Sequence, residues 1–279
     1  MKKIAALTMV RNDDFFLGKW TAYYGALLGK ENLYIFFDGE DQTVPECTRG
    51  CFTKLLPRVE GNVQASDKKR IDIMSEFAAG LLERYDMIIG TDIDEFVIVD
   101  PALGKSLPEF LSGVDMDGFN SVSALGVDVI QNIRKEIGLD MDKPLLSQRR
   151  FARLSTRYTK SSVLCKPVQW GSGFHRTRKG NYHIIPGLYL FHFGCADMSF
   201  LGLKMDDKDL SERGWNHHLF KRRRMMKQLP CLPVRKWDTW TKRAVWLQAR
   251  IRHFYAWNKP AMLGLRIVVE IPDRFSSLV

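Results

Sequence analysis

Short apolar runs alternate with longer, helically spaced segments over the first hundred residues. Residues 4–10 and 33–37 are continuously apolar, as buried parallel strands are. Between them, over residues 15–28, aromatic side chains recur at helical spacing and are expected to pack in the core. A third strand near residues 51–59 and a helix over about 66–84 continue the alternation. Strands that alternate with helices predict an α/β fold with a mostly parallel central sheet flanked by helices.

Apolar strand patterns return after residue 118. Residues 119–130 alternate enough for one or two strands, and residues 162–168 and 188–194 predict two more. The segment 133–153, interrupted by a proline, is expected to fold over the site with its arginines, Arg149, Arg150 and Arg153. We therefore expect one catalytic domain over residues 1–202, followed by an extension.

Three carboxylates follow the apolar run of residues 85–90, where that predicted strand ends: Asp92, Asp94 and Glu95. Ligands of open α/β sheets bind at the carboxyl ends of the strands, so a site is expected here. Asp92 and Asp94 would point to opposite faces of a regular strand, and they can approach one ion only if the chain bends. Hard oxygen ligands suit Mg²⁺ or Mn²⁺. The stretch therefore predicts a metal-bound nucleoside diphosphate-sugar site, and the alternative is a solvated acidic turn.

Charged residues also end the earlier strands. Arg11 follows the first strand, and Asp38 and Asp41 follow the second, so one edge of the sheet collects polar groups. Such an edge is the expected geometry of a nucleotide crevice. The chain has no G-x-G-x-x-G and no Walker loop, so neither a dinucleotide-binding fold nor a P-loop enzyme is indicated.

Three ordered stretches together resemble the family-2-like bacterial glycosyltransferases with a GT-A fold. They are residues 10–14 (VRNDD), 35–43 (IFFDGEDQT) and 92–96 (DIDEF). The family repeats an Arg-Asn-Glu opening, an Asp-x-x-Ser-x-Asp turn and an Asp-x-Asp-Glu-Phe motif in this order. The chain departs from it with Asp13 where Glu is usual and Glu40 in place of the serine of the turn. The resemblance covers residues 4–100 and, more loosely, 160–195.

The resemblance implies a nucleotide-sugar donor of the UDP or GDP type, Mn²⁺ or Mg²⁺ as cofactor, and inversion at the sugar. It places Arg11 beside the base or diphosphate, and Asp38 at the base or ribose. Asp92 would contact the ribose side of the donor and the metal, and Asp94 would bind the metal. A divalent ion would neutralise the charge of the diphosphate leaving group. Arg70 is expected to add a cationic contact, or else to belong to a solvated helix start.

An inverting transfer needs a group that takes the proton of the acceptor hydroxyl. Asp128 follows the site strand in the expected order, and Glu95 is the other candidate, although a strand-edge Asp is the plainer interpretation of Asp128. The usual Glu-Asp pair of the family is not recognisable, so the base is not identified. The resemblance also suggests His192 as a metal ligand and His175 near the donor phosphates; otherwise each is a hydrogen-bonded histidine. Trp170, in a glycine-rich loop, is a candidate sugar platform.

The positive charge of the chain lies at its C-terminal end. Residues 1–202 carry 25 basic and 25 acidic side chains, whereas residues 203–279 carry 17 and 7 and supply the whole net charge of +10. Residues 221–227 are mostly basic, and residues 235–257 mix basic residues with tryptophans, which predicts a mostly helical basic extension that binds an anionic membrane surface. A packing helix with a basic outer face is the alternative. No zinc finger, RRM or heptad accompanies it, so no nucleic acid is expected.

Five cysteines without disulfide or zinc spacing are typical of reduced thiols in a cytosolic protein. No apolar run approaches the roughly 20 residues that span a bilayer. We therefore expect a cytoplasmic protein, peripheral on the inner membrane face if the extension binds lipid. The expected function is sugar transfer to a glycan, lipopolysaccharide or lipid-linked acceptor. The alternatives are a nucleotidyltransferase and a non-catalytic protein that binds an acidic polymer.

Overall fold

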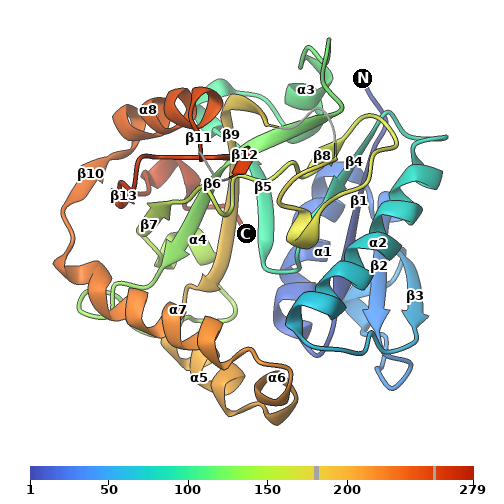
Figure 1. Cartoon of the computed structure of the whole chain (residues 1–279), viewed down its shortest axis with the longest axis horizontal. Coiled ribbons are helices and arrows are strands. Elements are labelled where there is room, and N and C mark those ends of the chain that lie inside the picture. The colour runs from blue at the N-terminus through green and yellow to red at the C-terminus, as the bar shows by residue number, and fades with distance from the viewer. Residues whose placement is uncertain (179–181, 254–255) are drawn as a thin grey trace.

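A computed structural model describes residues 1–178, 182–253 and 256–279 (Figure 1). Its first half contains the parallel part of the sheet, in the strand order β3-β2-β1-β4. Two long helices, α1 and α2, connect these strands in sequence. Their bounds are β1 Ile4–Val10, α1 Asp14–Leu28, β2 Leu33–Asp38, β3 Phe52–Leu56, α2 Val63–Leu81 and β4 Met87–Gly90. The predicted strands and helices of this half are thus confirmed within a few residues.

Strand β1 is apolar throughout because both of its faces are covered. Ile4, Ala6 and Val10 share a core cluster with the buried side of α1. Ala5, Leu7 and Met9 point the other way and share a second cluster with the buried side of α2. Side chains alternate along a strand, so a continuous apolar run is what a strand between two helical layers requires.

The second half turns the sheet into a mixed one. Strand β9 lies between β5 and β6, antiparallel to the first and parallel to the second. Strand β6 also pairs with β7 and β8, and β8 joins this half to β4. The bounds are β5 Glu95–Val99, β6 Ser121–Ile130, β7 Phe151–Leu154, β8 Val163–Leu164 and β9 His183–Cys195. The α/β class with a central sheet flanked by helices is confirmed, and its parallel core is β1–β4.

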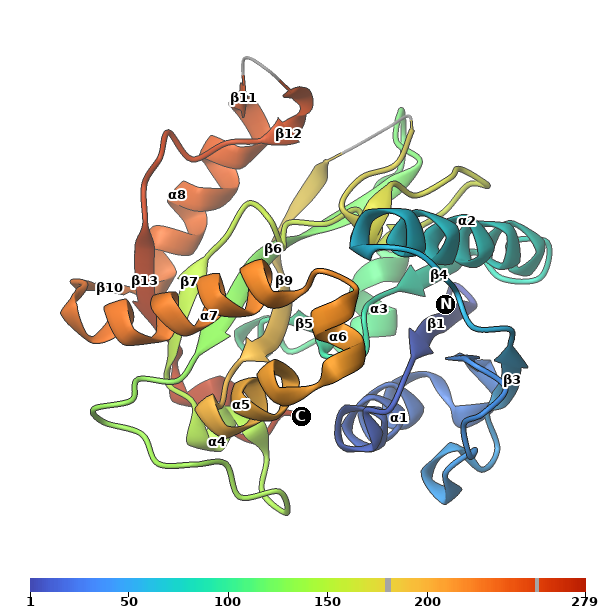
Figure 2. The ribbon, with the colours of Figure 1, turned by 60° about the horizontal axis from the view of Figure 1, so that its bottom comes forward.

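The C-terminal residues are part of this sheet and not an extension of it. Strand β13 pairs with β7, and β10 pairs with β13, so residues beyond 202 complete the same sheet. Helices α5, α6 and α7 follow β9, and α7 runs across β9 (Figure 2). The bounds are α5 Met198–Asp206, α6 Lys208–Glu212, α7 Asn216–Gln228, β10 Val234–Lys236, α8 Trp237–Arg250 and β13 Ile267–Glu270. The predicted boundary at residue 202 is therefore wrong as a structural division, because strand pairing crosses it.

The tryptophans expected at a membrane surface have different environments. Trp237 is buried against Phe191 and Phe275, with ring centroids 5.9 and 5.2 Å away. Trp246 on α8 is 55% exposed. Tyr255 lies outside the described residues, and the side chain of Trp257 is not described either. The indole of Trp237 is therefore part of the core and cannot contribute to a lipid-binding face of this segment.

Short elements complete the fold. They are α3 Leu107–Ser112, α4 Leu145–Gln148, β11 Arg252–His253, β12 Ala256–Pro260, and the 3₁₀ turns η1 Lys30–Asn32, η2 Glu46–Thr48, η3 Pro101–Leu103, η4 Ser172–Phe174, η5 Leu229–Cys231 and η6 Asp273–Phe275. Among the described residues, no helix combines the length and apolar character that crossing a membrane demands.

Candidate active site

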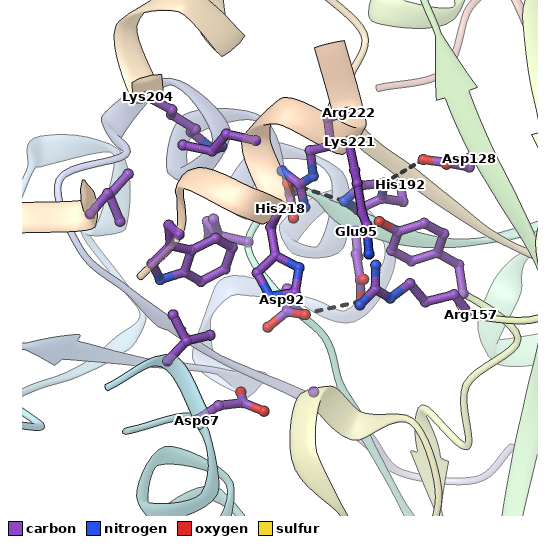
Figure 3. Close-up of a pocket in the computed structure, with 18 of the residues that line it drawn as sticks. Asp67, Asp92, Glu95, Asp128, Arg157, His192, Lys204, His218, Lys221 and Arg222 are labelled. Atoms are coloured by element: carbon purple, nitrogen blue, oxygen red, sulfur yellow. Dashed lines mark hydrogen bonds and ion pairs between the residues drawn. The ribbon is translucent and has the colours of Figure 1, made fainter. Parts of the chain in front are cut away.

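A cavity of about 910 Å³, here called the cleft, opens at the carboxyl ends of β1, β2 and β4. Helix α2 contributes one wall, and α5, α6 and α7 contribute the opposite wall (Figures 2 and 3). The charged side chains that line it are Arg11, Asp13, Asp38, Arg58, Asp67, Arg70, Asp92, Asp94, Glu95, Asp128, Arg153, Arg157, Lys160, Lys204, Asp207, Asp209, Arg213, Lys221, Arg222, Arg224 and Arg266. Residues from across the chain thus meet in one cavity. For the N-terminal half of the chain, this agrees with the prediction that polar residues gather at the carboxyl ends of the parallel strands.

The ends of β1 and β2 present a guanidinium and a carboxylate to the cleft. Asp38 accepts hydrogen bonds from the Arg58 side chain and from the Val59 backbone N–H, the latter at 2.6 Å. Arg11 donates to the Asp38 carbonyl at 2.8 Å and pairs with Asp41 at 2.8 Å. Gly39, at φ 129°, leaves room for this pair, because a β-carbon there would overlap both side chains. Arg11 and Asp38 therefore lie together as expected, whereas Asp41 reaches the cleft only through Arg11.

A buried network of charges follows β4. Lys160 places its Nζ 2.8 Å from Asp92 and 2.6 Å from Glu95, and Arg70 pairs with the other oxygen of Asp92 at 2.8 Å. Burial opposes ionisation of Asp92, but Lys160 and Arg70 outweigh it and lower its pKa. Burial and the neighbouring Asp92 and Asp94 raise the pKa of Glu95, against the effect of Lys160. This network holds the turn that carries Asp94.

Asp94 lies at the centre of a second group of side chains. Its Oδ2 is 3.5 Å from Nε2 of His192, and the Nδ1 of His192 is 2.8 Å from Asp128. The register of the sheet explains this, because His192 on β9 is opposite Asp128 on β6 and opposite Glu95 on β5. Tyr158 stacks on the imidazole with ring centroids 3.8 Å apart. The imidazole is therefore fixed between two carboxylates, and Asp94 is its neighbour on the cleft side.

Sequence reasoning missed the cations of the opposite wall as site residues. Figure 3 shows Lys204 from α5 and His218, Lys221 and Arg222 from α7 around the same cavity as Asp92, Glu95 and His192. The basic run of residues 221–224 was the available signal. It indicated that this segment is positively charged, but not which of its side chains point into the cleft. That depends on how α7 packs against β9.

Three predicted site residues have roles that differ from those expected. Trp170 is 2% exposed, packs on Gly90 and donates its indole N–H to the Ser161 carbonyl, so it is core and offers no face to a sugar. Asp128 lies behind His192 and accepts from Arg153, so it orients the imidazole instead of meeting substrate. Glu95 is 1% exposed beneath Lys160, which makes it structural as well. His175 does line the cleft, and burial lowers its pKa to about 3, so it is neutral.

The expected metal ligands do not all converge. Asp94 and His192 face one another, but both oxygens of Asp92 are engaged by Arg70 and Lys160. In the described parts of the chain, no group of three or more His, Cys, Asp or Glu side chains could hold a metal ion. Asp94 and His192 alone, with the guanidinium of Arg222 beside them, do not fit a resident divalent cation. Metal dependence stays a prediction from the resemblance.

No family model matches the chain, and no curated protein sequence matches it. Among solved structures, it is similar to the WbbM bifunctional glycosyltransferase at 13% identity and a TM-score of 0.25, over 48% of this chain and 24% of that one. It is also similar to mannose-1-phosphate geranyltransferase from Thermus thermophilus, at 12% identity and a TM-score of 0.27, over 98% and 76%. A third is CMP:2-keto-3-deoxy-manno-octonic acid synthetase complexed with CTP, at 11% identity and a TM-score of 0.28, over 79% and 86%. The chain thus spans about a quarter of the bifunctional protein. Likenesses with TM-scores this low carry no argument about function, which must be inferred from the residues of the cleft.

Proposed function

We propose that this protein is a glycosyltransferase whose donor is a nucleoside diphosphate-sugar. The observation that supports this best is that one cleft holds both carboxylates and cations. Carboxylates lie at the ends of β2 and β4 beside the cations that pair with them, and hydroxyl and amide groups of a nucleoside or sugar can donate to such oxygens. Cations of α5 and α7 face them, where phosphates can accept. A ligand with a polyhydroxy part and a diphosphate matches both walls.

The two parts of the donor would contact different elements. The nucleoside would lie beside Arg11 and Asp38, at the ends of β1 and β2, and the diphosphate would extend toward α7. The transferred sugar would then lie near Asp94, between these positions. The acceptor would be a glycan or lipid-linked sugar of the cell envelope, reached from the cytoplasmic face.

Asp94 is the proton acceptor in this proposal. Within the described residues it has no Lys or Arg within ion-pair distance, whereas Asp92 and Glu95 share Lys160. Burial raises the pKa of Asp94, but His192, Lys204 and Arg222 outweigh burial, so the pKa is lowered and the group is ionised.

The transfer itself then balances without a further reactant. The acceptor oxygen bonds to the anomeric carbon, the bond from that carbon to the phosphate oxygen breaks, and its electrons leave with the nucleoside diphosphate. Asp94 takes the hydroxyl proton, and attack opposite the leaving group inverts the anomeric carbon. His192, held by Asp128, positions Asp94.

A nucleotidyltransferase is the second candidate, and one observation disfavours it. Strand β1 passes to α1 through Arg11, Asn12 and Asp13, and the side chain of Asp13 caps the helix. This connection has no glycine-rich loop that could wrap a triphosphate.

The experiment combines binding and product analysis. UDP-, GDP-, CMP- and dTDP-sugars are screened by thermal shift, and a true donor should raise Tm through mass action. The donor that binds should release nucleoside diphosphate slowly in water. Asp94→Asn should abolish release while keeping the thermal shift, and Asp117→Asn, on an exposed turn away from the cleft, should change neither. Pyrophosphate as the product would identify a nucleotidyltransferase, and binding without turnover by any donor and acceptor would favour a binding protein.

A further inference from the structure

Arg222 is one of the basic residues of α7 that line the cleft, together with Lys221 and Arg224. Arg223 beside it is exposed and lies outside the cleft. Within the described residues no carboxylate lies within 4.0 Å of the guanidinium of Arg222, although Asp94 and Asp128 are near enough to contribute to its charged state. On the strand side of the cleft, Arg11, Arg58 and Arg70 each pair with a carboxylate.

A glycine on β9 allows this guanidinium to approach the imidazole. A β-carbon at Gly194 would lie 2.6 Å from Nε2 of His192 and 2.8 Å from Nη1 of Arg222. Real side chains do not pack that closely, so any other residue would push one of the two groups away. Gly194 therefore keeps Arg222 beside the Asp94–His192 pair.

That placement disfavours a divalent ion between Asp94 and His192. The ion would lie close to the guanidinium of Arg222, and like charges repel strongly where water is scarce. The same placement favours an anion. A cation held in a cleft without a carboxylate partner carries a desolvation cost that a bound phosphate offsets through charge-assisted hydrogen bonds.

Two lysines extend the positive region along the same wall. Lys221 points into the cavity from α7, and Lys204 from α5 reaches it near Asp13, with its Nζ 3.3 Å from that carboxylate (Figure 3). Three cations spread along one wall match a diphosphate better than a single phosphate. The guanidinium lies close to His192, which contacts the proposed reaction centre at Asp94.

We propose that Arg222, with Lys221 and Lys204, binds the diphosphate of the donor and neutralises the leaving group, so that the protein needs no divalent metal. This rests on the proposed function for the identity of the donor, but the anion site itself can be tested without a sugar. Arg222 would hold the two phosphates and stabilise the charge that develops on the departing oxygen. Helix α7 would thus supply the group that the family resemblance assigns to a metal.

The test is calorimetric binding of inorganic pyrophosphate to the full-length protein after exhaustive removal of metals. Wild type should bind without metal. Arg222→Ala should weaken binding about 10- to 100-fold, the range for losing hydrogen bonds to a charged group. Arg223→Ala, one residue along the same helix, should bind as wild type does, and Arg222→Lys should recover part of the loss.

The outcomes separate this inference from the proposed function. Pyrophosphate binding only in the presence of Mn²⁺ or Mg²⁺, or equal losses in the Arg222 and Arg223 variants, would overturn the anion site. Sugar transfer that requires Mn²⁺ and persists in Arg222→Ala would overturn it while keeping the glycosyltransferase. Metal-free pyrophosphate binding that depends on Arg222, without binding of any nucleotide-sugar, would keep the anion site and overturn the function.

Discussion

Lys160 joins the acidic turn after β4 to the rest of the cleft, and its removal tests that role. The side chain is 2% exposed and pairs with Asp92 and Glu95. In Lys160→Met, Asp92 keeps Arg70 at 2.8 Å, but Glu95 becomes a buried carboxylate without a cationic partner in the described structure. Breaking a buried pair from one side costs about 3–5 kcal/mol. We expect the loss in the free energy of unfolding to approach that size as pH rises above 8.

The pH dependence of this loss identifies its cause. Burial and the two aspartates already raise the pKa of Glu95, and without Lys160 it rises further. A folded-state pKa above the unfolded one means that the folded state binds more protons between the two values, so stability falls as pH rises through that window. The pKa of Glu95 is already about 8 with Lys160 present, so wild type and variant change alike below pH 8. Their stability difference should therefore grow as pH rises above 8, with a slope of up to about 1.4 kcal/mol per pH unit.

Urea unfolding followed by far-UV circular dichroism at pH 7 to 9.5 measures the difference. The double variant Lys160→Met/Glu95→Gln is the matched control, because it removes the carboxylate that the single change leaves unpaired. It should regain most of the stability and lose the pH slope. A deficit that is equal at pH 7 and pH 9.5, or that the second change does not relieve, would refute the interpretation of Glu95 as the group left uncompensated.

Three further outcomes are expected. Arg11→Ala and Asp38→Ala should each weaken nucleoside diphosphate binding about 10-fold or more, whatever the sugar, and unchanged calorimetric affinities in both would contradict the placement of the nucleoside. Trp237→Ala should cost about 3–5 kcal/mol in urea unfolding because its indole fills the aromatic core; a loss below about 1 kcal/mol would argue against that packing. Charge reversal at Lys242 and Arg243, on the exposed side of α8, should reduce co-sedimentation with anionic vesicles at low salt, and no preference of the wild type for such vesicles would remove the membrane from the account.

The local pattern of apolar and polar residues was sufficient to predict those elements whose contacts are made by residues close together in sequence. The apolar runs and helical spacings of the first hundred residues predicted β1, α1, β2 and α2, because each element buries its own periodic face. The ends of these strands also indicated where polar groups would gather. Arg11 and Asp38 do lie together in the cleft, since parallel strands end at one edge of a sheet.

Tertiary structure decided what depends on strand register and on packing between distant segments. His192 meets Asp128 and Asp94 because β9 enters between β5 and β6, a pairing that no local periodicity encodes. Trp170 is core because Gly90 leaves it a place against β4. Arg222 faces the cleft and Arg223 does not, because packing of α7 against β9 sets the rotation of that helix. Composition determines how much charge the chain carries, but only long-range contacts determine which charges share a low-dielectric cavity, and those contacts form between residues far apart in sequence.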